Sequence, residues 1–210
     1  IPGIQPVLMD EKRNEITGNQ VDGNLCIRFP WPGIARTIWG DHQRYKDTYF
    51  TAFPGKYFTG DGALRDEVGY YRITGRVDDV IIVSGHNLGT APIEDSINEH
   101  PAVAESAIVG YPHDIKGNAL YGFVILKETG EGRDKDNLRK EINQLISDQI
   151  GPIAKLDKIQ FVTGLPKTRS GKIMRRILRK IAEGDFNNFG DTTTLLDPDV
   201  VEEIKNNRIG

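Results

Sequence analysis

Cysteine is almost absent from this chain of 210 residues, which has only Cys26. One cysteine excludes an internal disulfide and a zinc site of the usual several-cysteine type, so a reducing compartment is the default. The predicted location is therefore the cytoplasm. The four histidines show no spacing suited to a metal, and no Gly-x-Ser-x-Gly motif occurs. The sequence gives no support to a zinc enzyme or a serine hydrolase.

Long apolar runs and an excess of one charge are also lacking. No run reaches 18 apolar residues, and the first residues lack the regions of a signal peptide, so neither a membrane span nor export is expected. Lys and Arg number 27 against 30 Asp and Glu, which leaves a formal charge of −3. That balance argues against nucleic acid as a partner. With 38% hydrophobic and 27% charged residues, the composition is that of an ordinary globular protein.

The chain has a different character on either side of residues 77 and 78. Residues 1–77 are rich in Gly and Pro with short strand signals, so this part is predicted to be mostly β. A hairpin is predicted over Gly62–Ile73, around an acidic turn closed by Gly69. Since the chain does not begin with Met, we also consider it as a piece of a longer protein.

Residues 78–210 alternate short apolar runs with helical periods, which is typical of a small α/β or α+β domain. Helices are predicted to begin at Thr90, with a side-chain cap, at Asp136, and at Ser170, which acts as a cap; the last one ends at Gly184. The tail after Asp185 is expected to wrap the surface. Strands are predicted over Val80–Val83, Val103–Val109, Leu120–Leu126 and Ile159–Val162.

Two candidate binding residues, one acidic and one basic, precede the boundary at residue 77. Asp61 follows a strand in Phe58-Thr59-Gly60-Asp61-Gly62, where its carboxylate could accept two hydrogen bonds from a ribose diol; ordinary turn chemistry is the alternative. Arg76 could bind ribose or phosphate oxygens in its fork geometry, or form a structural salt bridge with the neighbouring Asp78 and Asp79.

Two glycine-containing loops lie in the second part. Ser84–Thr90 is interpreted as a loop that leads into a helix, either to face an anion or merely to connect a strand to a helix. Pro166–Arg176 is strongly basic, and its mobile loop lysine, Lys172, is suited to touching an anion. A solvated face, nuclear localisation and nucleic-acid binding are the alternatives, and the acidic overall balance weakens the last two.

Four motifs occur in a fixed order: Tyr57-Phe58-Thr59-Gly60-Asp61, Ile73-Thr74-Gly75-Arg76-Val77-Asp78-Asp79, Val83-Ser84-Gly85-His86 and Pro166-Lys167-Thr168-Arg169-Ser170-Gly171-Lys172. Together they resemble the adenylate-forming acyl-CoA synthetases, and most closely the AMP-forming branch that uses acetate. The resemblance spans nearly the whole chain and continues to Gly190-Asp191-Thr192.

The resemblance implies that acetate is activated with ATP to acetyl-AMP and then transferred to CoA, with ATP/AMP, Mg²⁺ and CoA as cofactors and small-molecule substrates. It implies an α/β (α+β) fold in which residues 1–77 are the incomplete, mostly-β end of a large ATP- and acyl-binding domain. Residues 78–210 would be a small mobile C-terminal domain that turns about a hinge at Asp78.

The resemblance also implies roles for single residues. Asp61 would hold the ribose hydroxyls and Arg76 would add a ribose or phosphate contact. Ser84 and Gly85 would line the pantetheine channel in one domain orientation, whereas Lys172 would enter the site for adenylation only. A cation position would involve the backbone carbonyls of Asn98 and Val103 and the ring of His100.

Two positions depart from the family pattern. Asn87 stands where an arginine usually follows Ser-Gly-His and contacts phosphate, and Ser147 stands where an arginine usually meets the CoA nucleotide. We therefore expect altered contacts with phosphate and CoA at these two positions.

The family's phosphate loop, adenine contacts and carboxylate pocket would lie upstream of residue 1. The N-terminal part of the same enzyme is thus an expected partner, and the 210 residues alone are predicted to be inactive. A lysine acetyltransferase or deacetylase acting at Lys172 is a further expected partner. Two alternatives stay open: a ligase for propionate or another short-chain acid, and a non-catalytic stand-alone binding module.

Overall fold

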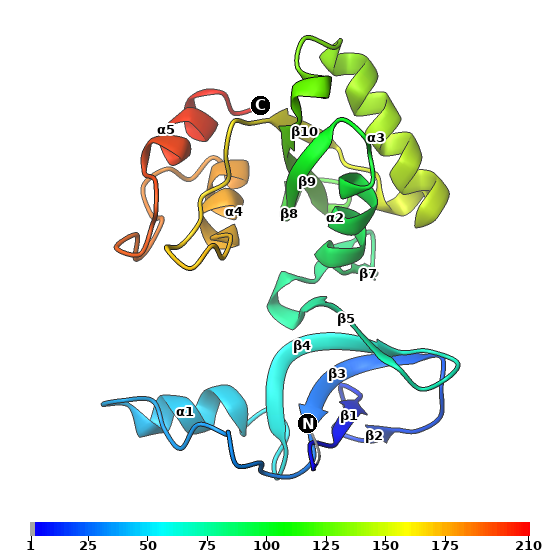
Figure 1. Cartoon of the computed structure of the whole chain (residues 1–210), viewed down its shortest axis with the longest axis vertical. Helices are drawn as coiled ribbons and strands as arrows, with labels where there is room; N and C mark the ends of the chain where they lie inside the picture. The colour runs from blue at the N-terminus through cyan, green and yellow to red at the C-terminus, as the bar shows by residue number, and fades with distance from the viewer. Residues whose placement is uncertain (1–2) are drawn as a thin grey trace. The chain divides into compact units, whose positions relative to one another are not determined.

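The computed structural model describes residues 3–210, and the chain divides into two compact units between Asp79 and Val80. The division lies two residues after the boundary expected at residue 77. Figure 1 shows the elements of both units, each of which is built on its own sheet.

The first unit is a five-stranded antiparallel sheet in the order β2-β1-β3-β4-β5. The predicted hairpin is confirmed: the side chain of Asp66 accepts the N–H groups of Val68 and Tyr70, and Gly69 adopts a φ of 94° that suits glycine. The mostly-β character is confirmed as well. The strands are β1 (Pro6–Met9), β2 (Glu15–Ile16), β3 (Val21–Ile27), β4 (Tyr57–Arg65) and β5 (Tyr71–Arg76).

One helix of the first unit, α1 (His42–Tyr49), was not predicted. Asp41 caps it by accepting the N–H of Arg44 at 2.9 Å, and Tyr45 is its one buried residue. A helix with one buried position has no apolar stripe, so periodicity cannot reveal it. A single 3₁₀ turn, η1 (Val77–Asp79), ends the unit.

The second unit has a mixed sheet in the order β10-β9-β6-β7, with β8 also paired to β9. Only β10 runs parallel to its neighbour β9; the other pairs are antiparallel. The strands are β6 (Ile81–Val83), β7 (His86–Leu88), β8 (Val103–His113), β9 (Gly117–Leu126) and β10 (Lys158–Phe161).

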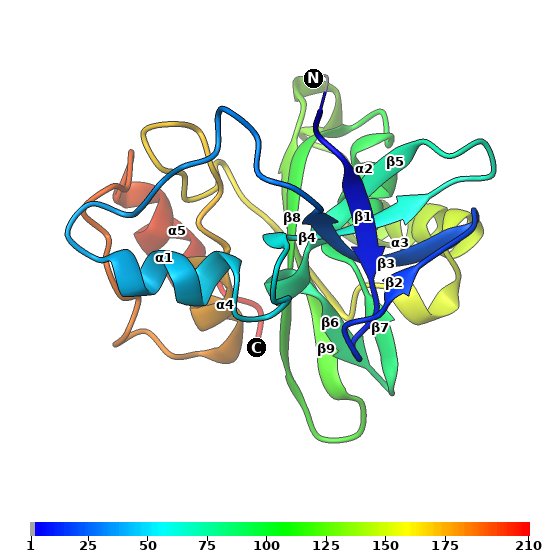
Figure 2. The same ribbon diagram turned by 90° about the horizontal axis from the view of Figure 1, so that it is seen from below.

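Helices cover both faces of this sheet. Along β9, Leu120 and Val124 belong to the core cluster that also holds residues of α2 and α3, whereas Tyr121 and Phe123 belong to the cluster with α4 and α5. Figures 1 and 2 show these two helix pairs on opposite faces, so the unit has three layers and the α/β class is confirmed. The helices are α2 (Thr90–Asn98), α3 (Lys135–Gln149), α4 (Arg175–Glu183) and α5 (Asp199–Asn206), with short 3₁₀ turns η2 (Glu128–Gly130) and η3 (Pro152–Ala154).

Two predicted helix caps were wrong. The N-cap of α2 is Gly89 without a side-chain bond, and Thr90 is the first helical residue. Ser170 does not cap α4, which begins at Arg175 after Met174, because the preceding residues form a hairpin. The predicted end of α4 at Gly184 is confirmed, since this residue adopts a left-handed φ of 81°.

The tail also differs in part from the expectation. It contains α5, which buries Val201 and Ile204 against the cluster beneath α4. A helix of two turns with two buried residues gives too short a pattern to be recognised from the sequence. Within residues 3–210, no helix is long and apolar enough to cross a membrane.

Candidate functional site

Asp61 and Arg76 lie opposite each other on neighbouring strands. Antiparallel pairing of β4 with β5 places the two residues in register, and Arg76 Nη1 lies 3.5 Å from Asp61 Oδ1. The backbone N–H of Asp61 donates to Thr59 Oγ1 at 3.1 Å. The turn after a strand expected for Asp61 was wrong, because the residue lies within β4, where Gly60 has a positive φ of 79°. The Asp61 side chain is about one third exposed, at 31%, so its carboxylate is accessible to a diol donor.

Arg76 has three oxygen partners within the first unit. Its Nε donates to Asp78 Oδ1 at 3.0 Å and its Nη1 to the carbonyl oxygen of Thr59 at 3.3 Å, besides the pair with Asp61. Burial opposes the charged form of Arg76, but the carboxylates of Asp78, Asp61 and Asp79 outweigh it and raise the pKa of the guanidinium. The structural salt bridge considered from the sequence is thus present, and it holds the arginine beside Asp61.

Asp78, the expected hinge, is in the 3₁₀ turn η1, one residue before the division of the chain. Its side chain is 73% exposed and pairs with Arg76. The hinge role stays a prediction.

Ser84 and Gly85 form the two-residue turn of a β-hairpin between β6 and β7. Their φ angles of 49° and 83° are both positive, as in the tight turns that join two antiparallel strands. The Ser84 N–H donates to the carbonyl oxygen of Lys116 at 3.0 Å. The loop predicted over Ser84–Thr90 was wrong in one respect, because it contains strand β7, and exposed Asn87 lies on that strand.

Lys172 stands in a second hairpin, before α4. Lys167 pairs with Ile173, and the N–H of Thr168 donates to the carbonyl oxygen of Lys172 at 2.9 Å. The Lys172 side chain is exposed, so its ammonium is accessible. Lys167, in contrast, is engaged with Glu105 at 2.7 Å.

Ser147 is half-buried in the last turns of α3. One turn earlier on the same helix, Asn143 and Gln144 line an open surface groove of about 350 Å³ together with Arg139, Lys140 and Lys155. A basic groove of this kind is compatible with an anion.

The ring of His100 is buried and both its nitrogens have partners. Nδ1 accepts the N–H of Ala102 at 3.2 Å, and Nε2 lies 3.1 Å from Glu141 Oε2. The imidazole therefore cannot ligate a cation without losing one of these contacts. No group of three or more His, Cys, Asp or Glu side chains suited to a metal is found among residues 3–210.

The structure thus brings together Asp61 with Arg76, and Ser84 with Gly85 and Asn87. Lys172 and Ser147 stand on other elements of the second unit. Sequence reasoning missed buried Glu94 of α2, which accepts the N–H of Ile108 at 2.8 Å and pairs with Arg175 at 2.5 Å. The available signal was an acidic residue next to the apolar position Ile93 on a helix.

The second unit and the fold of the chain are similar to those of known adenylate-forming enzymes. Residues 92–172 match the model of the AMP-binding enzyme C-terminal domain. Acetoacetyl-CoA synthetase from Streptomyces lividans shares the fold, with a TM-score of 0.82 at 22% identity, covering 97% of this chain and 30% of that one. The anthranilate CoA ligase AuaEII, in complex with anthranoyl-AMP, has a TM-score of 0.76 at 30% identity, covering 87% and 34%.

Curated proteins with similar sequences are named acetyl-coenzyme A synthetase. The chain is 59% identical to that of Parvibaculum lavamentivorans and 57% identical to that of Methylobacterium radiotolerans, in each case over 206 residues. These matches cover 98% of this chain and 31% of each relative, so the chain spans about one third of their length. The resemblance to AMP-forming acetyl-CoA synthetases is confirmed.

Proposed function

We propose that the chain is the C-terminal portion of an AMP-forming acetate–CoA ligase. The observation that carries the proposal is the 59% identity to an acetyl-coenzyme A synthetase over 98% of the chain. The pairing of Asp61 with Arg76 supports it, because a carboxylate beside a guanidinium suits a ribose diol next to a phosphate. The two units would be the end of the large domain and the mobile domain.

The first half-reaction would be adenylation. A carboxylate oxygen of acetate forms a bond to the α-phosphorus of ATP, while the bond from that phosphorus to the pyrophosphate oxygen breaks. Negative charge from the carboxylate and the phosphates accumulates, and the exposed ammonium of Lys172 is suited to neutralise it. Asp61 would orient the ribose, and Arg76 would contact the ribose or the phosphate.

The second half-reaction would transfer the acyl group. The CoA sulfur forms a bond to the acyl carbon, the bond to the AMP oxygen breaks, and the thiol proton passes to solvent. This step gathers less charge than adenylation and does not require Lys172. The exposed Ser84–Gly85 turn would lie along the pantetheine arm, where a small backbone allows close approach.

Mg²⁺ would accompany ATP and neutralise phosphate charge when bound. The His100 ring, with both nitrogens engaged, does not fit as a ligand, and we route no step through the site at Asn98, His100 and Val103. The single buried cysteine and the sequence relatives are compatible with the cytoplasm as location.

The substrate test uses the protein expressed from the complete reading frame. We expect exchange of pyrophosphate into ATP to be fastest with acetate, when acetate, propionate and butyrate are compared. Fastest exchange with propionate would identify the alternative ligase, since a pocket one methylene larger discriminates by only about 1–3 kcal/mol. No exchange with any acid would favour a non-catalytic module.

The 210 residues alone are expected to give no acetyl-CoA. Formation of acetyl-CoA by them would contradict the assignment of half the site to the upstream part.

Modification of Lys172 offers a second test of its role. Acetylation by a lysine acetyltransferase removes the ammonium charge, so the acetylated protein should lose adenylation and keep acyl transfer from supplied acetyl-AMP. Treatment with a deacetylase should restore adenylation. Equal loss of both half-reactions would count against a role confined to adenylation.

A further inference from the structure

The hairpin that carries Lys172 is tightly bonded within itself. Besides the bond from Thr168 to the Lys172 carbonyl, the N–H of Lys172 donates to Thr168 Oγ1 at 3.1 Å. The N–H of Gly171 donates to the carbonyl oxygen of Thr168 at 2.8 Å, and Gly171 has a φ of 83°. These bonds fix the Lys172 backbone relative to Thr168, while the lysine side chain remains exposed.

A segment of the tail lies along this hairpin. We call residues 192–196 the clasp. The N–H of Leu196 donates to the carbonyl oxygen of Lys167 at 2.8 Å, and the N–H of Arg169 donates to the carbonyl oxygen of Thr194 at 3.2 Å. Between them, Thr168 and Leu195 form an antiparallel bridge. The clasp therefore acts as a third short strand beside the Lys172 hairpin.

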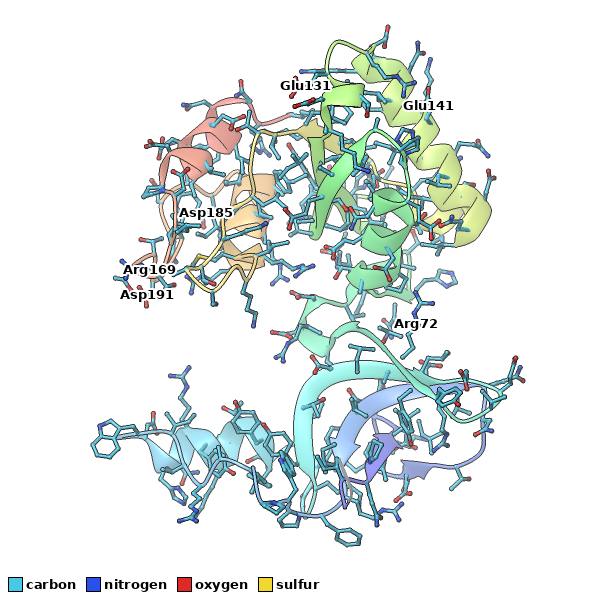
Figure 3. The ribbon with its side chains drawn as sticks, viewed as in Figure 1. Arg72, Glu131, Glu141, Arg169, Asp185 and Asp191 are labelled. Carbon is cyan, nitrogen blue, oxygen red and sulfur yellow. The ribbon has the colours of Figure 1, made fainter. Side chains whose placement is uncertain are left out.

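The clasp is in turn fixed to the start of α4. Arg176 Nη2 donates to the carbonyl oxygen of Asp191 at 2.5 Å, and the side chain of Asp191 accepts the N–H of Thr193 at 2.9 Å. The guanidinium covers Gly190, where a Cβ would lie 3.1 Å from it. Figure 3 labels Arg169 of the Lys172 hairpin and Asp191, which precedes the clasp.

We propose that the clasp is a positioning element for Lys172, which holds the lysine hairpin in the conformation used for adenylation. The inference rests on the proposed function. A displacement of about 1 Å in a reacting group can cost roughly a hundredfold in rate, and a long flexible side chain adds to any motion of its backbone. An anchored hairpin limits that motion, so the loop is a fixed support rather than the mobile loop expected from the sequence.

The test removes one clasp bond and keeps the rest. Leu196→Pro deletes the N–H that donates to Lys167, and Leu196→Ala is the matched control because the Leu196 side chain is 63% exposed. In the protein from the complete reading frame, we expect Leu196→Pro to slow pyrophosphate exchange by about tenfold. Transfer of the acetyl group from supplied acetyl-AMP to CoA should stay within about twofold, as should both steps in Leu196→Ala.

A structural readout accompanies the rates. Amide hydrogen exchange of residues 167–172 should accelerate in Leu196→Pro and not in Leu196→Ala. In a Leu196→Pro protein whose circular dichroism spectrum matches that of the unchanged protein, unchanged pyrophosphate exchange or equal slowing of both half-reactions would overturn the inference.

A second variant guards against misfolding. If Leu196→Pro does not fold, the same comparison is made with Arg176→Lys, which keeps the positive charge but loses the fork that reaches Asp191. Selective loss of adenylation supports the clasp, whereas equal loss or no loss contradicts it. Lys172→Ala is assayed beside both variants: full pyrophosphate exchange in Lys172→Ala would refute the proposed role of the lysine itself, independently of the clasp.

Discussion

At the scale of single residues, Gly60 shows how closely the backbone approaches Arg76. A Cβ at Gly60 would lie 2.7 Å from the Arg76 guanidinium nitrogens, and the φ of Gly60 is 79°. Gly55 has the same φ of 79° but open space around it. A Cβ added at Gly55 would therefore cause backbone strain alone, whereas a Cβ added at Gly60 would cause the same strain and also crowd Arg76.

We predict that Gly60→Ala destabilises the first unit more than Gly55→Ala. Each substitution should cost about 1–2 kcal/mol for the left-handed conformation, and Gly60→Ala should cost roughly 1 kcal/mol more because Arg76 must move. Urea unfolding followed by tryptophan fluorescence measures both, since Trp31 and Trp39 lie in this unit. An equal decrease in the free energy of unfolding in the two variants would show that the Arg76 side chain moves aside without loss of stability.

The thiol of Cys26 gives a pH-dependent prediction. Burial raises the pKa of this thiol from 9.0 to about 12. Between these values the unfolded chain releases the proton that the folded chain retains, so the free energy of unfolding should fall as pH rises from about 9 to 12. At pH 8, a thiol reagent should label Cys26 slowly in the folded chain and rapidly in urea. Rapid labelling of the folded chain would contradict the burial of Cys26.

Local signals singled out Asp61 and Arg76 as candidates, with turn chemistry and a structural salt bridge as the alternatives, and their roles toward a nucleotide stay predictions. The hairpin register then explains why they meet. Glu94 could not be identified in the same way, because its partner Arg175 lies far along the chain and belongs to another helix. A contact between distant elements leaves no local pattern in one sequence.

At the scale of elements, Glu94 joins α2, β8 and α4. Its carboxylate accepts the N–H of Ile108 and pairs with Arg175, and only 11% of its side chain is exposed. Removing one partner of such a pair leaves buried polar groups without compensation.

We predict that Glu94→Ala destabilises the second unit by about 3 kcal/mol. Glu94→Gln should cost clearly less, because the amide oxygen can still accept the N–H of Ile108. Urea unfolding of the 210-residue chain, followed by tyrosine fluorescence or NMR, would measure the difference. If alanine and glutamine proved equivalent, the bond to Ile108 would contribute nothing.

Strands were predictable where apolar residues alternate or form short runs, as in β8 and β9. The hairpin around Lys172 was not, because Ser170 followed by a basic helical pattern imitates a helix start. The decisive contact comes from Thr192–Leu196 in the tail, and such tertiary pairing overrides the local signal. The same holds for α5, which is stabilised by the cluster that it covers.

At the scale of the whole molecule, each core cluster lies within one unit. The second unit contains two large clusters on the two faces of its sheet, whereas the first contains two small ones. A larger buried apolar surface gives a domain more independent stability.

We predict that residues 80–210 fold without the first unit. Their NMR spectrum should be well dispersed and should overlay the corresponding signals of the 210-residue chain, apart from residues next to the cut. A collapsed spectrum would show that the second unit depends on residues before Val80.

The central claim is that Lys172 serves adenylation and not acyl transfer. The most direct measurement compares the two half-reactions in Lys172→Ala of the complete protein with the unchanged protein. The account predicts that pyrophosphate exchange with acetate falls by at least about a hundredfold, while transfer from supplied acetyl-AMP to CoA stays within about threefold. Undiminished pyrophosphate exchange, or parallel loss of both half-reactions, would contradict it.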